Sequence, residues 1–227
     1  MNRTVLFSAL LILAGTASAR PDDNNRVRDI DKINSSITAE AGQAYGDLST
    51  VNGSIRIESN ATLKDAETVN GSIRLADDVH SGGLTTVNGS IHVGSRARID
   101  GAIETVNGGI FVDRGGKVQR GIETVNGAIG LVDTDLGGGI ETMNGDITVG
   151  VGSHVKGGIR IEKPGKSWGL RMGKPKVPRV VIGPNVVVEG ALVFEREVTL
   201  YVHQSARVGA VSGATAQRYN GASPPKD

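Results

Sequence analysis

The tetrapeptide Thr-Val-Asn-Gly decides the fold of this chain and stands at residues 50–53, 68–71, 86–89, 105–108 and 124–127, with Met replacing Val in a sixth copy at 142–145. Successive Asn residues of these copies are 18 or 19 positions apart. A degenerate copy, Ile33-Asn34-Ser35, precedes Asn52 by 18 residues. A fixed period of this length indicates a repeat architecture in which each copy is one structural unit.

Alternation of apolar and polar residues follows each Asn-Gly, as in Ser-Ile-Arg-Ile at 54–57 and Gly-Ile-Phe-Val at 109–112. This period of two is typical of strands. Asn-Gly is also a strong hairpin signal, so an antiparallel meander or barrel is one alternative. The other is a β-solenoid, in which each repeat is one coil and equivalent residues of successive coils stack.

The solenoid is favoured because identical residue types recur at an identical phase. Stacked coils are separated by about 4.8 Å, a distance at which Asn side chains can hydrogen-bond to one another along the axis. We therefore predict an all-β, single-stranded β-solenoid of about nine coils. We expect the Gly after each Asn to adopt a positive φ at the corner. The predicted corner ladder comprises Asn34, Asn52, Asn70, Asn88, Asn107, Asn126 and Asn144.

The repeat continues beyond its last Asn-Gly. Residues 182–192 overlay residues 93–103, and residues 200–208 overlay residues 91–99, which adds two coils without the Asn corner. The phase places Lys163 where the next Asn belongs, so we expect a loop inserted at one coil corner. The predicted organisation is a signal peptide at 1–19, an N-terminal cap or linker at 20–31, repeat coils at 32–162, a basic inserted loop at 163–179, C-terminal coils at 180–212 and a loose tail at 213–227.

The first nineteen residues have the pattern of a secretory signal. A short basic start is followed by an apolar run from Val5 to Ala14 and by Ala17-Ser18-Ala19. Such a sequence predicts export and cleavage after Ala19, and the run is too short to span a bilayer. The predicted localisation is periplasmic or secreted.

Composition excludes several classes of protein. The chain has no Cys, so neither disulfides nor thiolate metal sites are available. It carries 25 basic and 24 acidic residues, and cleavage after Ala19 removes only Arg3, which leaves 24 of each. We therefore expect no nucleic-acid partner. No cofactor motif is present, and we predict no cofactor.

Two bacterial families are similar to this chain over about residues 30–212. The Thr-Val-Asn-Gly repeats resemble the adhesin-like β-solenoid domains of secreted bacterial proteins of unknown function. The stretch from Val181 to Gly190 resembles bactofilins, the polymer-forming cytoskeletal proteins. The resemblance implies a right-handed β-helix with a core of small aliphatic residues, and the bactofilin part implies end-to-end self-association. Neither family supplies catalytic residues.

The inserted loop is the first candidate binding site, because it is the one local departure from the repeat. It combines cations with the single Trp of the chain and contains no acid. Cations around an aromatic ring suit an anionic envelope polymer or an anionic lipid surface. The residues are Lys163, Lys166, Trp168, Arg171, Lys174, Lys176 and Arg179. The alternative is a solvated loop with no binding role.

A second candidate is an acidic ladder of Glu104, Glu123 and Glu141, with Glu67 further out. Stacked carboxylates repel one another modestly in water and can attract a cation or a basic partner. β-Helix enzymes that cut polysaccharides use paired carboxylates, but the coils here are nearly identical. We therefore expect a solvated face, no catalytic residues and no metal site. The four His residues, at 80, 92, 154 and 203, are expected on the surface.

Three classes of function remain. The leading hypothesis is a non-catalytic structural or adhesin-like solenoid of the bacterial cell envelope. The second is a self-assembling, bactofilin-like polymer, since solenoid ends expose unpaired strands. The third, a carbohydrate-active β-helix enzyme, is not expected.

Overall fold

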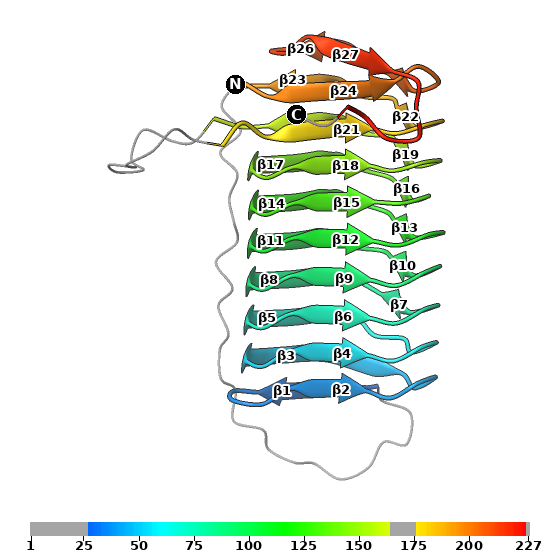
Figure 1. Cartoon of the computed structure of the whole chain (residues 1–227). Helices are drawn as coiled ribbons and strands as arrows, with labels where there is room; N and C mark the ends of the chain where they lie inside the picture. The colour runs from blue at the N-terminus through cyan, green and yellow to red at the C-terminus, as the bar shows by residue number, and fades with distance from the viewer. Residues whose placement is uncertain (1–26, 164–175, 226–227) are drawn as a thin grey trace, which may run out of the picture.

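The computed structural model describes residues 27–163 and 176–225. Every strand pairing in these residues is parallel, and the strands form three sheets that run along one rod (Figure 1). This is a β-solenoid of about nine turns with a period of about 19 residues, as the repeat predicted. Among the described residues no helix is long and apolar enough to cross a membrane.

Sheet A contains the Thr-Val-Asn segment of each repeat and has ten strands. Its strands are β1 (Arg28–Lys32), β3 (Tyr45–Asn52), β5 (Ala66–Asn70), β8 (Leu84–Asn88), β11 (Ile103–Asn107), β14 (Ile122–Asn126), β17 (Ile140–Asn144), β20 (Ile159–Ile161), β23 (Leu192–Phe194) and β26 (Val211–Ser212).

Sheet B follows the Asn-Gly corner and also has ten strands. They are β2 (Ile37–Ala39), β4 (Ile55–Ile57), β6 (Ile73–Leu75), β9 (Ile91–Val93), β12 (Ile110–Val112), β15 (Ile129–Leu131), β18 (Ile147–Val149), β21 (Arg179–Ile182), β24 (Thr199–His203) and β27 (Ala216–Tyr219).

Sheet C is the third side of the rod, so that each coil is roughly triangular in cross-section, and it has seven strands of two residues. They are β7 (His80–Ser81), β10 (Arg98–Ile99), β13 (Lys117–Val118), β16 (Asp135–Leu136), β19 (His154–Val155), β22 (Val187–Val188) and β25 (Arg207–Val208).

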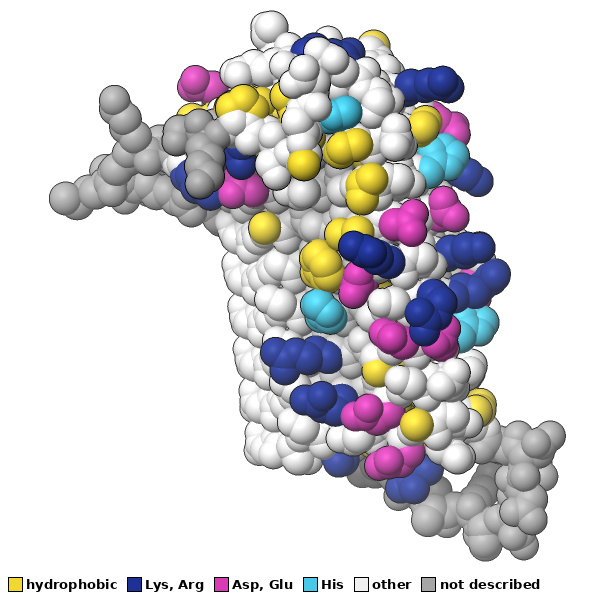
Figure 2. All heavy atoms as spheres, turned by 45° about the vertical axis from the view of Figure 1, so that its right-hand side comes forward, with side chains coloured by type: hydrophobic (Ala, Val, Ile, Leu, Met, Phe, Trp, Pro, Cys, Tyr) yellow, Lys and Arg dark blue, Asp and Glu magenta, His cyan; other side chains and the backbone are white. Residues whose placement is uncertain are grey.

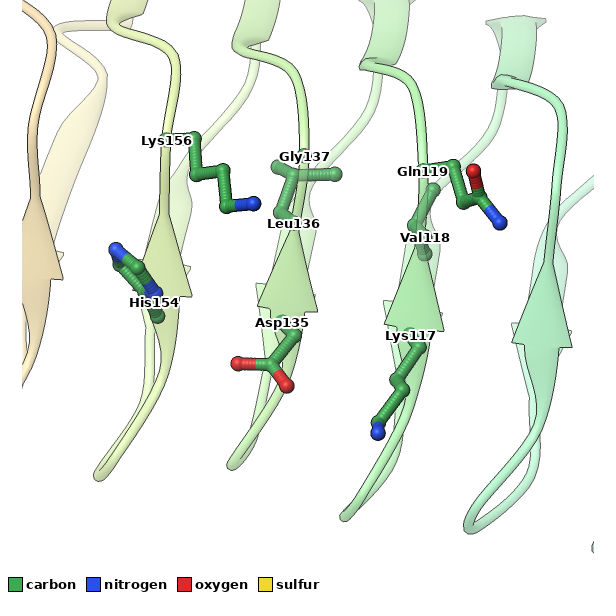
Figure 3. A pocket seen from close by; sticks show the side chains of 8 residues that line it. All are labelled: Lys117, Val118, Gln119, Asp135, Leu136, Gly137, His154 and Lys156. Atoms are coloured by element: carbon green, nitrogen blue, oxygen red, sulfur yellow. The ribbon is translucent and has the colours of Figure 1, made fainter.

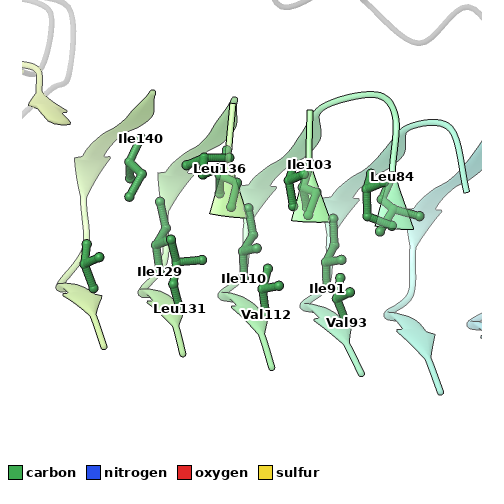
Figure 4. Close-up of a cluster of buried hydrophobic side chains, with 14 of the residues drawn as sticks. Leu84, Ile91, Val93, Ile103, Ile110, Val112, Ile129, Leu131, Leu136 and Ile140 are labelled. Carbon is green, nitrogen blue, oxygen red and sulfur yellow. The ribbon is translucent and has the colours of Figure 1, made fainter. Parts of the chain in front are cut away.

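The core lies inside the triangle and is built from aliphatic side chains in columns (Figure 4). Sheet A supplies Leu84, Ile103, Ile122 and Ile140, each fully buried. Sheet B supplies pairs such as Ile110 and Val112. Burial alternates along the strands, because successive side chains of a strand point to opposite faces. The apolar members of the alternation predicted from the sequence therefore face the core.

Glycine after each Asn is required for a reason other than the predicted one. None of these glycines has a positive φ; apart from Gly213, the positive-φ residues lie at the turn between sheets B and C, for example Asn60, Asp78 and Gly115. A Cβ atom on Gly71 would instead lie 1.9 Å from the carbonyl oxygen of Gly53 in the preceding coil. The prediction of a positive φ is wrong, and close approach of stacked backbones excludes a side chain at this corner.

The C-terminal segment is also more ordered than predicted. Strand β27 falls within residues 213–227, which the sequence suggested to be a loose tail, and it pairs with β24 over four residues. Tyr219 of this strand is buried and its hydroxyl donates to the Ile182 carbonyl at 3.3 Å. β26 and β27 together form a tenth, incomplete coil. At the other end, β1 starts at Arg28, inside the predicted cap or linker at 20–31.

Candidate functional site

The Asn ladder runs along the corner between sheets A and B. Each Asn from Asn52 to Asn144 is the last residue of its sheet A strand, whereas Asn34 lies two residues after the end of β1, and the strand pairing places Asn52 beside Asn70 and Asn107 beside Asn126. Each side-chain amide donates to the Oδ1 of the Asn one coil earlier, at distances from 2.8 Å for Asn52 to 3.1 Å for Asn144. The predicted seven-residue ladder is therefore confirmed as a structural element.

Arg196 ends this ladder and was missed by the sequence analysis. Its guanidinium group donates to Asn144 Oδ1 at 2.6 Å and to the carbonyl oxygens of Met143 and Lys176, each at 3.1 Å. Asn144 has no further Asn above it, and Arg196 supplies the missing donor. Arg196 lies between β23 and β24, two residues after Phe194, and so has the phase of Asn144, two residues after Thr142; this phase was the one signal in the sequence.

The inserted loop lies where the phase of the repeat placed it. β20 ends at Ile161 in sheet A and β21 begins at Arg179 in sheet B, so the insertion occupies the Asn corner of its coil. Four predicted loop residues lie outside the described residues: Lys166, Trp168, Arg171 and Lys174.

The three described cations of the loop differ in their surroundings. Lys163 is exposed. Lys176 pairs with Asp146, with 2.7 Å between Nζ and Oδ2. The Arg179 guanidinium lies 4.9 Å from the Tyr201 ring centroid and donates to the Pro225 carbonyl. Lys176 and Arg179 therefore contribute to folding, and among the described cations of the loop Lys163 is the one left for a partner.

The acidic ladder is formed as the sequence predicted. Glu104 pairs in register with Glu123, and Glu123 with Glu141, on the outer surface of sheet A. The column then meets Arg160, whose Nη1 lies 2.9 Å from Glu195 Oε1. Each of the three carboxylates is half-buried. The ladder therefore ends at a cation of the chain itself.

Burial and neighbouring acids together raise the pKa of two carboxyl groups of sheet A, those of Glu123 and Glu67. Burial raises the pKa of Glu123, and the charges of Glu141 and Glu104 raise it further. The pKa of Glu67 is raised in the same way, by burial and then by Asp65 and Asp47. In residues 27–163 and 176–225 no cluster of three His or acidic residues could hold a metal ion.

Sheet C has a shallow depression of about 420 Å³ on its outer surface, lined by polar and charged side chains (Figure 3). Lys117, Asp135 and His154 lie along one column, and Gly137 leaves a gap between Gln119 and Lys156. His154 Nε2 is 2.7 Å from Glu189 Oε1, and His80 Nε2 is 2.7 Å from Asp100 Oδ2. The two His residues of this face therefore each contact an acid, and Arg98 also contacts Asp100 at 3.0 Å.

Comparison with known proteins gave no further identification. No protein-family model, curated protein or solved structure matches this chain.

Proposed function

We propose that this chain is an exported, non-catalytic structural or adhesin-like protein of the bacterial cell envelope. The observation that carries the proposal is a rod along which side chains of one type recur in register on sheet A, as in the Asn ladder at its corner and in Glu104, Glu123 and Glu141. Such a surface suits a partner that is itself a repeating polymer. The signal-like residues 1–19, which lie outside the described residues, support export.

Fractionation of bacteria that express the full chain with a C-terminal tag tests the proposal. We expect a processed protein with Arg20 at its N-terminus, measured by mass spectrometry, in the envelope fraction. Unprocessed protein in the cytosolic fraction would contradict the proposal.

The loop is tested by changing Lys163, Lys166, Arg171 and Lys174 to Gln, which leaves the structural contacts of Lys176 and Arg179 in place. We expect envelope association to fall and to become less sensitive to salt, because the lost contacts are electrostatic. The matched control changes the same number of exposed cations elsewhere, namely Lys64, Lys117, Arg120 and Lys156. An equal effect of both sets would show that the loop has no special role.

A self-assembling polymer is the second candidate. Within the described residues, one edge of β1 and β2 and one edge of β26 and β27 have no strand partner, and parallel edges of this kind can pair between copies. β1 carries four charged residues, Arg28, Asp29, Asp31 and Lys32, which disfavours edge pairing. Electron microscopy of the purified protein distinguishes the candidates: filaments favour the polymer, and single rods favour the first proposal.

A further inference from the structure

One column of outward side chains on sheet B differs from the rest of the surface. It follows β4, β6, β9, β12 and β15, and it contains Arg56, Arg74, His92, Phe111 and Gly130, which are neighbours in the strand register. We call these five residues the sheet B strip. On this face, dark blue, cyan and yellow side chains follow one another along the rod (Figure 2).

The two arginines of the strip have no acidic partner among the described residues. Arg56 and Arg74 are exposed and directly paired in register, and neither guanidinium group has a hydrogen-bond or ion-pair partner among residues 27–163 and 176–225. Some other exposed arginines of the rod do have one, such as Arg96, which contacts Asp78 at 2.6 Å, and Arg98, which contacts Asp100 at 3.0 Å. Arg114, Arg120 and Arg207 also have none among the described residues, but Arg56 and Arg74 are the two that pair directly in register. Like charges directly opposite each other on a sheet repel and lower the stability of the sheet. An anion bound to both guanidinium groups would remove this repulsion.

The aromatic part of the strip adjoins a notch. The His92 and Phe111 rings stack with centroids 5.1 Å apart and planes 21° apart. Gly130 follows Phe111 in the register and has no side chain; a Cβ there would lie 3.0 Å from the Phe111 ring. A depression of about 550 Å³ lies over these residues, bordered by Ser72 and Ser90. The Phe111 ring therefore presents an apolar surface to this depression, and serine hydroxyl groups lie at the border of the depression.

Further along the rod, the outward side chains of the same sheet B column are covered by other residues of the chain. Val181 and Tyr201 also point outward from sheet B, yet they are 8% and 5% exposed and form a small cluster with Tyr219. Arg179 lies over the Tyr201 ring. The chain thus covers the apolar outer residues near its C-terminus, whereas Phe111 is left half-exposed.

We propose that the sheet B strip binds an acidic polysaccharide that runs along the rod. Carboxylates of the glycan would pair with Arg56 and Arg74, the apolar face of a sugar ring would pack on Phe111, and the notch at Gly130 would receive part of the next sugar. Stacked coils repeat at about 4.8 Å, so a linear polymer with regularly spaced charges meets both arginines in turn. This inference rests on the proposed function and adds the site and the ligand class.

Nucleic acid fits the strip less well. A phosphate backbone is held by many cations along its length, and here the two arginines are followed by His92, Phe111, a glycine and, at the far border of the depression, Asp146. The strip offers one exposed phenyl ring for base stacking, whereas single-stranded nucleic acids are held on several such rings in succession.

Binding of the purified full chain to polygalacturonate, measured by affinity electrophoresis, tests the proposal, with dextran as the neutral glycan. We expect retardation by polygalacturonate alone, weakening with added salt. The double variant Arg56→Gln/Arg74→Gln and the variant Phe111→Ala should each reduce affinity by about tenfold, consistent with the loss of paired charges or of an aromatic contact. Gly130→Thr, which fills the notch as Thr148 does in the next strand, should also weaken binding.

The matched control is Lys117→Gln/Arg120→Gln, which removes the same charge from exposed positions away from sheet B. Circular dichroism of each variant confirms folding. Equal affinity of the strip variants and the wild type, equal loss in the control, equal binding to dextran, or tighter binding to single-stranded DNA than to polygalacturonate would each overturn the proposal. A wild-type chain found in the envelope that does not bind polygalacturonate overturns only this inference, and a chain that binds it but stays in the cytosol overturns only the proposed function.

Discussion

At the scale of single residues, the Thr of each repeat explains how a polar side chain is tolerated in the core. Thr50, Thr68 and Thr86 are buried, and each hydroxyl donates to a carbonyl oxygen of the preceding coil at 2.9 Å. The distance lengthens to 3.2 Å at Thr124, and the Thr142 hydroxyl has no partner among the described residues. Buried hydroxyls need such partners, and from Thr50 to Thr124 the Thr column ties each corner to the one before it.

Glu123 gives a prediction about pH. Its raised pKa means that the folded protein binds a proton more readily than the unfolded chain does, so the stability that goes with the protonated form is lost as pH rises through the folded pKa. Glu123→Gln should therefore increase the free energy of unfolding at neutral pH, by roughly 0.5 kcal/mol for a partly exposed group. Below the ordinary Glu pKa, at about pH 3.5, variant and wild type should be equally stable.

Urea unfolding at the two pH values measures this difference. Glu40→Gln is the control, since Glu40 is exposed in the turn before β3 and lies outside the ladder. A stabilising effect of Glu123→Gln that persists undiminished at acid pH would show that repulsion between carboxylates is not its cause.

Residue types in phase made the Asn and Glu ladders predictable, because a side chain that recurs every 18 or 19 residues must stack if the coils do. The reason for the Gly at each corner was not predictable. It depends on the distance between the backbones of adjacent coils, which the Asn-Gly pair does not reveal. The conformational freedom of Gly suggested a positive φ at the corner instead, and the structure does not have one there. The sheet B strip was missed for a related reason: its members differ from one another, so repetition did not reveal them.

At the scale of elements, the insertion is stabilised by groups that come from other coils. Asp146 accepts from both the Lys176 side chain, at 2.7 Å, and the Arg179 backbone amide, at 2.9 Å. Arg196 reaches from the segment between β23 and β24 to the last Asn of the ladder. The sequence could place the loop by counting the phase, but the contacts that hold its two ends span 20 to 53 residues and follow no repeat.

Arg196→Met should separate the contribution of these hydrogen bonds from that of the aliphatic stem. Loss of charged donors to three oxygens should lower the free energy of unfolding by about 1–2 kcal/mol. Hydrogen exchange should accelerate at β17 and at residues 176–178, next to the lost bonds, with β5 and β8 unaffected. Arg207→Met, an exposed Arg of sheet C, is the matched control; equal effects of the two changes would contradict a capping role.

At the scale of the whole molecule, the strands of each coil pair only with those of the coils before and after it, so stability approximates a sum over coils and their interfaces. The Arg196 and Tyr219 side chains, which each reach past one coil, are exceptions near the C-terminus. The pairing order follows the chain order in all three sheets. Coil number and the site of the insertion followed from counting. The strand β27 did not, because residues 213–227 lack both the Asn corner and the alternation of the earlier coils, and its packing depends on Tyr219.

A pair of equivalent core substitutions tests this one-dimensional character. Ile110 in β12 and Ile37 in β2 are both buried, but Ile110 has a coil on each side and Ile37 lies in the first coil. Ile110→Ala should cost about 2–5 kcal/mol and should accelerate hydrogen exchange in β9, β12 and β15 more than at either end. Ile37→Ala should affect β2 and β4 and leave β12 protected, because the remaining coils still cover one another. If either variant accelerated exchange uniformly along the rod, the solenoid would unfold as one unit, and a partner bound at the sheet B strip would then stabilise both ends as strongly as the coils it touches.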